Sequence, residues 1–208
     1  MADEVSFTLD GREVAARPGE TIWQVAHRHG TEIPRLCLST EPDFHPEGNC
    51  RLCVVEIAGR RALASSCTTR PQAGMRVLTD SPRAVAARRT VMELLLAEAS
   101  PRAWSDCARL GREMGVTATR YPAGARDGAV DRGHPGIDVD RDACIHCRRC
   151  VQACRELTIQ EVIGMAGRGG SSRIVFDLDD PMGVSTCVSC GGCAQTCPTG
   201  ALSFRRPA

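Results

Sequence analysis

Apolar and polar residues alternate in the first part of the chain, which is typical of short strands. Residues 5–9 (VSFTL) alternate, Asp10-Gly11 is a strong hairpin signal, and residues 12–16 can pair back on the first strand. A short helix is predicted from Thr21 to His29, where Gly30 ends it. Strand-like runs return at 52–57 and 75–78. Residues 1–80 are therefore predicted to form a compact α+β roll.

A helical pattern begins at the next segment, residues 81–136. Ser81 can cap a helix whose first position is Pro82, and we expect this helix to end near Ala99, ahead of Pro101. Its apolar residues recur at helical spacing: Val85, Val91, Met92, Leu95 and Leu96. Residues 101–136 are rich in Gly, Pro, Arg and Ala with weak periodicity, which predicts a poorly regular connector.

The last segment, residues 137–208, contains an internal repeat of four cysteines. The pattern C-x-x-C-x-x-C-x-x-x-C occurs twice, about forty residues apart. Its members are Cys144, Cys147, Cys150 and Cys154, then Cys187, Cys190, Cys193 and Cys197, which Pro198 follows. This repeat is the strongest signal in the chain.

Composition and charge exclude several functions. The 26 basic and 25 acidic residues nearly balance, so no field attracts nucleic acid or an acidic membrane surface. Every basic residue is arginine, which excludes Schiff-base, P-loop and lysine general-base chemistry. Only 3% of residues are aromatic, so the small cores need another source of stability.

Thirteen cysteines suggest metal ligation. The first ten residues lack the apolar core of a signal peptide, and the apolar run Leu94 to Ala97 is too short to span a bilayer. We therefore expect a cytoplasmic protein without membrane insertion. Cytosolic thiols stay reduced, so disulfides explain such a cysteine content poorly.

The tandem repeat predicts two [4Fe–4S] clusters. Three closely spaced cysteines wrap one face of a cubane, and in two-cluster ferredoxins the fourth cysteine ligates the other cluster. One cluster would take Cys144, Cys147, Cys150 and Cys197, and the other Cys187, Cys190, Cys193 and Cys154. Two structural zinc sites are the alternative, but they would leave the third cysteine of each run unused.

A further set of cysteines, near the N-terminus, predicts a [2Fe–2S] cluster. Its ligands would be Cys37, Cys50, Cys53 and Cys67, with Gly48 in a loop that approaches the cluster closely. The spacing is longer than that of plant-type ferredoxins, and a zinc ribbon is the alternative interpretation.

Residues around these cysteines resemble a known family. IPRLC (33–37), GNCRLCVVE (48–56) and ASSC (64–67) resemble the [2Fe–2S] domain of the large iron–sulfur subunit of respiratory NADH dehydrogenase. The same domain opens the diaphorase iron–sulfur subunit of NAD-reducing hydrogenases and the large subunit of NAD-dependent molybdenum or tungsten formate dehydrogenases. Residues 143–156, VIGM (162–165) and 180–202 most resemble the formate dehydrogenase branch.

This resemblance implies a fold in three parts. It consists of a β-grasp [2Fe–2S] ferredoxin-like domain (1–80), a helix and connector (81–136) and a bacterial-type 2[4Fe–4S] ferredoxin-like domain (137–208). The relatives carry one more cluster after the long helix, held by one His and three Cys, but here only Cys107 remains. We expect this degenerate site to hold no cluster and Cys107 to be a leftover buried thiol. The family's catalytic portion is expected on another polypeptide, because residue 208 follows closely on the last motif.

Several other features invite functional interpretations. The glycine-rich stretch 164–172 fails the dinucleotide pattern at Ser172, so a turn between two short strands is expected. His27 and His29 lack metal-ligand partners and are interpreted as packing or surface residues. His146, inside the Cys144 loop, can raise a cluster potential or simply be exposed. The nearby Arg148, Arg149 and Arg155 can dock an acidic partner or balance cluster charge.

The predicted function is one-electron transfer with no catalytic residue in this chain. Three clusters would form a relay between a flavin/NADH-binding subunit and a molybdopterin-type or other metallo-oxidoreductase subunit, with formate dehydrogenase as the first expectation. Alternatives are a relay subunit of an NAD-linked hydrogenase, a free polyferredoxin and a zinc-stabilised scaffold. Nucleic acid is not an expected partner.

Overall fold

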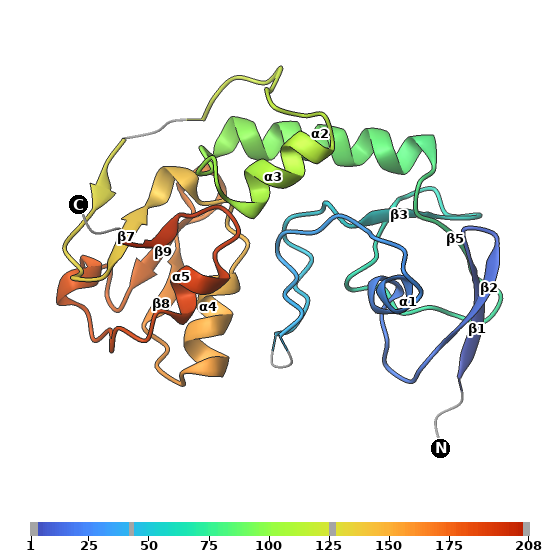
Figure 1. Cartoon of the computed structure of the whole chain (residues 1–208), viewed down its shortest axis with the longest axis horizontal. Coiled ribbons are helices and arrows are strands. Elements are labelled where there is room, and N and C mark those ends of the chain that lie inside the picture. Colours follow the sequence, from blue (N-terminus) through green and yellow to red (C-terminus); the bar gives the residue numbers. More distant parts are fainter. Residues whose placement is uncertain (1–3, 42–43, 125–127, 206–208) are drawn as a thin grey trace. The chain divides into compact units, whose positions relative to one another are not determined.

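The computed structural model describes residues 4–41, 44–124 and 128–205, and it divides into two compact units (Figure 1). The first unit comprises 1–35 and 46–92, and the second comprises 36–45 and 93–208. The helix α2 (Pro82–Glu98) begins in the first unit and ends in the second. Within the described residues, every helix is too short or too polar to cross a membrane.

The first unit is built on a mixed five-stranded sheet in the order β2-β1-β5-β3-β4. Its elements are β1 (Val5–Leu9), β2 (Arg12–Ala16), α1 (Ile22–Arg28), β3 (Val54–Ile57), β4 (Ala64–Ser65) and β5 (Arg76–Leu78). Strand β1 is antiparallel to β2 and parallel to β5, whereas β3 is antiparallel to both β5 and β4. The predicted hairpin and the predicted strands are confirmed, although β3 begins two residues later than expected.

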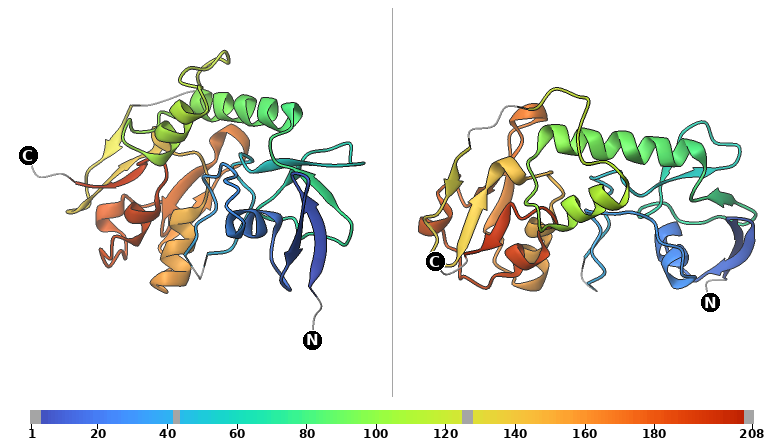
Figure 2. Two further views of the ribbon diagram at one scale, coloured as in Figure 1. Left: turned by 45° about the vertical axis from the view of Figure 1, so that its right-hand side comes forward. Right: turned by 45° about the horizontal axis from the view of Figure 1, so that its top comes forward.

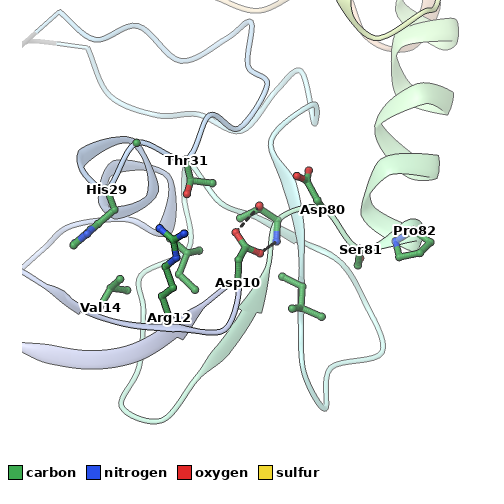
Figure 3. Close-up of a pocket in the computed structure, with 12 residues that line it drawn as sticks. Asp10, Arg12, Val14, His29, Thr31, Asp80, Ser81 and Pro82 are labelled. Atoms are coloured by element: carbon green, nitrogen blue, oxygen red, sulfur yellow. Dashed lines mark hydrogen bonds between the residues drawn. The ribbon is translucent and has the colours of Figure 1, made fainter.

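The hairpin turn also fixes the far end of β5. Asp10 and Gly11 have φ angles of 48° and 82°, as the tight two-residue turn requires, and Leu9 pairs with Arg12. The Asp10 carboxylate accepts hydrogen bonds of 2.7 Å from both the backbone N–H and the hydroxyl of Thr79 (Figure 3). These contacts occupy one of the two carboxylates, Asp10 and Asp80, that line the hollow shown in Figure 3.

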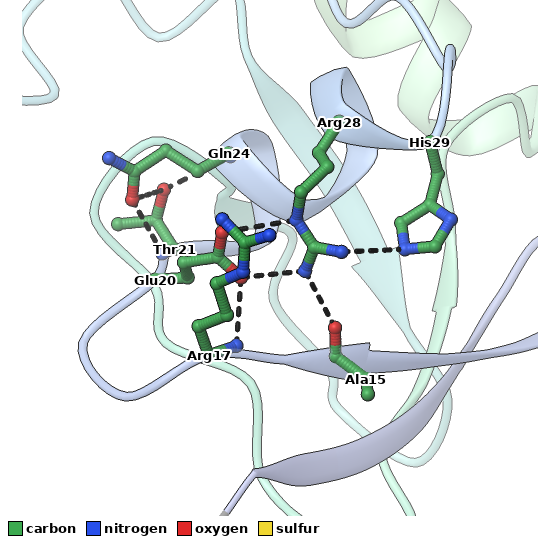
Figure 4. A network of polar contacts seen from close by, with 7 residues as sticks. All are labelled: Ala15, Arg17, Glu20, Thr21, Gln24, Arg28 and His29. Carbon is green, nitrogen blue, oxygen red and sulfur yellow. Dashed lines mark hydrogen bonds and ion pairs between the residues drawn. The ribbon is translucent and has the colours of Figure 1, made fainter.

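Helix α1 begins at the residue that the sequence indicates. Thr21 and Gln24 form a capping box, in which each side chain accepts a hydrogen bond from the other residue's backbone N–H (Figure 4). Ile22, Trp23, Val25 and Ala26 are buried, so one face of this short helix packs into the unit. At α2 the Ser81 hydroxyl accepts from the Ala84 N–H at 3.1 Å, which confirms the predicted cap.

The second unit contains two small antiparallel sheets and several short helices (Figures 1 and 2). The three-stranded sheet has the order β10-β7-β6, and β8 pairs with β9. Strands and helices are α3 (Asp106–Glu113), β6 (Val130–Asp131), β7 (Ile137–Asp140), α4 (Arg149–Gln152), β8 (Ile163–Ala166), β9 (Arg173–Phe176), α5 (Gly192–Thr196) and β10 (Leu202–Phe204). Single helical turns are η1 (Arg141–Ala143), η2 (Ala153–Leu157), η3 (Gly169–Ser171) and η4 (Met182–Val184).

The connector is more regular than the sequence predicts. Helix α3 was not expected, although Ser105 caps it by accepting a hydrogen bond from the Ala108 N–H at 3.3 Å. The helix is short, and its only buried residues are Cys107 and Gly111. Its sequence therefore lacks the helical repeat of apolar residues from which a helix is predicted. Backbone N–H groups of Arg102 and Cys107 donate to the carbonyls of Thr199 and Pro198, both at 2.9 Å. Tertiary contacts therefore order this segment.

The glycine-rich stretch forms the predicted turn between two strands. Gly164 lies in β8, and the turn to β9 passes through Gly167, whose φ is +75°. A Cβ atom on Gly167 would collide with the carbonyl oxygen of Ser171, so only glycine fits this position. The glycines thus serve a hairpin.

Candidate metal centres

The two cysteine runs adopt the same backbone conformation. His146 and Ser189 have φ angles of 53° and 60°, and their N–H groups donate to the sulfurs of Cys144 and Cys187, both at 3.4 Å. Two residues later the chain is again left-handed, and a short helix follows, α4 in one run and α5 in the other. The internal repeat is therefore structural as well as sequential, and N–H···S contacts already orient one sulfur of each run.

The first run lies around a small cavity together with the last cysteine of the second run. Cys144, Cys147, Cys150 and Cys197 all line this cavity. Its other walls are mainly apolar, and Arg148 and Thr199 are the polar residues among them. Burial raises the pKa of the Cys144 thiol to about 11 and raises those of Cys147 and Cys150 well above their usual range. Four thiols in an apolar setting are costly to ionise unless a cation neutralises them.

The second run gathers with the last cysteine of the first. Burial, together with the charges of Cys187, Cys190 and Cys154, raises the pKa of Cys193 to about 12. Cys154 lies in η2, which follows directly on α4, and α4 and α5 lie side by side (Figures 1 and 2). Cys150 also feels the charge of Cys193, so the two groups are neighbours.

The first unit holds three of the four remaining predicted ligands. The Cys53 and Cys67 sulfurs are 3.2 Å apart, and their hydrogen bond is the main reason why the pKa of Cys53 falls to about 7. Cys50 raises that pKa slightly through its own charge, so it too lies nearby. Cys37 belongs to the segment 36–45 of the second unit, and its participation in this site stays a prediction.

Two residues near these cysteines are not predicted by any sequence motif. The Ser65 hydroxyl lies 3.3 Å from the Cys53 sulfur and 3.4 Å from that of Cys67, and only its position two residues before Cys67 hints at this role. The Arg88 guanidinium is buried in α2, and its Nε donates to the Val54 carbonyl at 2.9 Å. Burial lowers the pKa of Arg88, whereas Asp80 and Cys53 raise it, so its charge is coupled to the cysteine site.

The histidines and arginines for which the sequence suggested a role differ in what they contact. His27 stacks on Trp23 with ring centroids 4.8 Å apart and pairs with Glu32, as expected of a packing residue. His29 contacts the Arg28 guanidinium, also in the first unit. Arg149 donates to the Thr196 hydroxyl at 3.1 Å, which joins the two repeats, and to the Leu36 carbonyl at 3.3 Å. His146 contributes its backbone N–H to the Cys144 loop.

The donor chemistry suits a sulfur-ligated group. All thirteen cysteines lie in the described residues, and none forms a disulfide. Among the described residues no group of three or more His, Cys, Asp or Glu side chains is placed to hold a single metal ion. Thiolates are the ligands of iron–sulfur clusters, whose several iron atoms draw on ligands from a wider volume than one ion does.

Comparison with known proteins identifies both ends of the chain. Residues 2–82 match a family described as a 2Fe-2S iron–sulfur cluster binding domain, and residues 143–201 match a 4Fe-4S dicluster domain. The chain thus has a 2Fe-2S domain followed by a 4Fe-4S dicluster domain, in a mixed α and β fold.

Whole-chain relatives are redox subunits. The gamma subunit of the NAD-reducing hydrogenase HoxS from Cupriavidus necator is 31% identical, over 84% of this chain and 76% of its own. The NADP-reducing hydrogenase subunit HndD of Solidesulfovibrio fructosivorans is 36% identical over 95% of this chain. A chain in the crystal structure of an NAD⁺-reducing [NiFe]-hydrogenase superimposes with a TM-score of 0.87 and 31% identity, covering 97% of this chain and 87% of that one.

The chain is also similar to a subunit of NADH-ubiquinone oxidoreductase and to a putative formate dehydrogenase. The 78 kDa subunit of NADH-ubiquinone oxidoreductase of Candida albicans is 32% identical over 97% of this chain, and a putative formate dehydrogenase of Staphylococcus haemolyticus is 28% identical over 97%. This chain spans only 29% and 21% of those relatives, and 36% of HndD. The chain is therefore related to the iron–sulfur domains of hydrogenases, NADH dehydrogenases and formate dehydrogenases alike. These similarities do not favour the formate dehydrogenase branch over the other two.

Proposed function

We propose that this chain, which belongs to the family of iron–sulfur subunits that includes the gamma subunit of NAD-reducing hydrogenase, relays electrons within an NAD(P)-linked oxidoreductase. One side of the relay would be a flavin/NAD(H)-binding subunit, and the other a separate metallo-oxidoreductase subunit. The observation that carries the proposal is the grouping of cysteines from both repeats. Four surround one cavity, and Cys154, Cys187 and Cys190 lie close enough to Cys193 to act on its charge.

The proposed cofactors are one [2Fe–2S] and two [4Fe–4S] clusters. Cys144, Cys147, Cys150 and Cys197 would ligate one cubane, and Cys187, Cys190, Cys193 and Cys154 the other. Cys37, Cys50, Cys53 and Cys67 would ligate the [2Fe–2S] cluster in a β-grasp domain, which the mixed sheet with parallel β1 and β5 supports. The clusters supply reversible one-electron chemistry when bound. The protein orients the sulfurs, excludes water from the first cubane's cavity and adjusts the local charge.

The region after α2 supports the absence of a fourth cluster. Cys107 is 0% exposed in α3, and its backbone is hydrogen-bonded to Pro198. One thiol enclosed by packed chain cannot replace a four-ligand set. We propose that Cys107 is structural. We further propose that residues 1–80, 81–136 and 137–208 form the [2Fe–2S] domain, the connector and the 2[4Fe–4S] domain, respectively. The chain would work in the reducing cytoplasm.

Two terminal partners have specific support. The alignment with the hydrogenase gamma subunit covers most of both chains, which favours a hydrogenase as the partner enzyme. The motifs around Cys144 and Cys187 favour a formate dehydrogenase type. The test is to purify the native complex anaerobically and measure NAD⁺ reduction with hydrogen and with formate. Activity with one substrate identifies the type, and a monomer without flavoprotein or metallo-oxidoreductase partners would contradict the relay subunit and favour a free polyferredoxin.

Cluster content is tested on the chain itself. We expect about ten iron atoms per chain with matching sulfide, and reduced-state EPR signals of both cluster types. About four additional iron atoms would show that the Cys107 region holds a cluster after all. A colourless zinc-containing protein would contradict the proposal and favour the scaffold.

A further inference from the structure

The second cysteine group reaches the surface through Cys190, which is exposed. Each group has two buried cysteines, but the other two of the first group, Cys144 and Cys197, are only half-buried, as Cys187 is in the second. Electron transfer to another protein requires a centre near the surface. Resting on the proposed function, the second cubane is therefore the candidate for exchange with a partner.

Apolar side chains surround this exposed site. Val188, next to Cys187, is 57% exposed, and Phe204 is 58% exposed. A Cβ on Gly191 would meet the Phe204 ring at 2.8 Å, so this ring borders the Cys190 loop. Leu157 and Ile159 are also exposed, and they flank Thr158, whose methyl lies against Gly192. We call Leu157, Ile159, Val188 and Phe204, which come from three segments around Cys190, the apolar rim.

Ile159 makes the rim unusual. It is 83% exposed, and its φ of 53° puts a β-branched residue in the left-handed region, where such residues are disfavoured. Neither its exposure nor its conformation stabilises the isolated chain. Unfavourable conformations of this kind concentrate at sites of recognition, so both observations point to a side chain held for a partner.

The charge beside the rim is mainly acidic. From Ile174 to Phe204 the chain carries three aspartates, Asp177, Asp179 and Asp180, and no Arg, Lys or His. The arginines that flank this stretch are paired, Arg173 with Asp179 and Arg205 with Asp138. Glu161 adjoins them, because the Asp177 N–H donates to the Val162 carbonyl at 2.9 Å. Asp177 also accepts from Thr186, which leads into Cys187, and so fixes the acidic loop beside the second run. By contrast, Arg148 and Arg149 lie within the first run.

We propose that the apolar rim and its acidic border form the docking surface for a redox partner that presents an apolar contact ringed by arginine or lysine. One electron passes between the second cubane and the partner's redox centre, so that one is oxidised as the other is reduced, with no proton or bond change. Apolar contact would give close approach, while opposite charge would accelerate and orient the encounter. An acidic partner would be repelled from this face.

The test uses ferric equine cytochrome c as a basic probe. The anaerobic full chain, reduced and freed of reductant, is mixed with cytochrome c in a stopped-flow instrument at several ionic strengths. We expect the second-order rate constant to fall roughly tenfold between low and physiological salt, as charge attraction is screened. The variant Glu161→Gln/Asp179→Asn/Asp180→Asn should be roughly fivefold slower at low salt and less dependent on salt.

A matched variant controls for net charge. Glu4→Gln/Glu13→Gln/Glu32→Gln removes the same charge from exposed acids of the first unit and should stay within about twofold of the parent. Ile159→Ser should slow the reaction at high salt, where apolar contact dominates. If both triple variants slow the reaction equally, or if the rate rises with salt, the proposed docking surface is wrong. That result leaves the proposed function intact, because the clusters are present. A preparation without [4Fe–4S] clusters overturns the proposed function itself, and this inference with it.

Discussion

The sulfurs of Cys53 and Cys67 lie 3.2 Å apart, with the Ser65 hydroxyl within hydrogen-bonding reach of both. The two residues are separated by β3 and β4, which pair antiparallel with Val54 opposite Ser65. Register in this small hairpin therefore sets the distance between the sulfurs. Two thiolates so close would repel each other without a cation, which is the chemical setting that a metal centre relieves.

The first prediction concerns iron content. Cys67→Ser should remove the [2Fe–2S] signal and about two of the roughly ten iron atoms while leaving both [4Fe–4S] signals, because the two sites draw on separate cysteines. Iron and sulfide analysis with EPR measures this. Cys107→Ala is the matched control, since Cys107 is buried but outside all three ligand sets. Loss of iron in the control would mean that Cys107 is a ligand.

A second prediction concerns the buried guanidinium of Arg88. Arg88→Met should lower the midpoint potential of the [2Fe–2S] cluster by tens of millivolts, on the order expected for losing a partly shielded charge nearby. The adjacent Arg89 is exposed on the same helix, so Arg89→Met should shift the potential far less. An EPR-monitored redox titration compares the two variants. Equal shifts would show that Arg88 has no special electrostatic role.

A third prediction separates two glycines of one turn. Gly167→Ala should destabilise the second unit by about 1–3 kcal/mol, because the new methyl meets the Ser171 carbonyl and the backbone has a positive φ. Gly170→Ala, whose added Cβ meets nothing within 4 Å, should change stability by less than about 0.5 kcal/mol. Urea unfolding of the holoprotein measures both. Similar stability of the two variants would refute this account of the turn.

The fourth prediction is a pH dependence at α1. Burial alone would raise the pKa of Glu20, but hydrogen bonds from Arg28 and the Arg17 N–H outweigh it and lower the pKa below 4.5 (Figure 4). A lowered folded-state pKa means that this stabilisation is complete above the unfolded pKa and is lost as pH falls through the folded value. Glu20→Gln should therefore cost about 1 kcal/mol at pH 7 and progressively less in acid below pH 4.5.

Thermal unfolding of parent and variant at each pH checks this prediction. Any cluster loss in acid affects both proteins alike, so their difference isolates Glu20. Glu32→Gln serves as the control, because Glu32 is largely exposed where it pairs with His27. A Glu20→Gln deficit that stays constant from pH 7 to pH 3 would contradict the assignment.

The sequence by itself determined the elements whose signals are local. Asp10-Gly11 predicts a hairpin, because its two-residue turn needs two positive φ angles. Ser81-Pro82 predicts the start of α2, because a serine hydroxyl can cap the helix and proline suits its first position. The spacing of the cysteine runs likewise predicted two similar loops, since three thiols at every third position imply a tight wrap.

The repeat predicted that the fourth cysteines exchange between the runs, but only the tertiary structure supplies the packing that brings them together. Cys197 lines the cavity of Cys144, and Cys154 lies near Cys193, because α4 and α5 pack side by side. Helix α3 and the cover over Cys107 also depend on contacts with the loop after Cys197, which no local pattern encodes. The exposed rim around Cys190 arises in the same way, because solvent access depends on how separate segments pack.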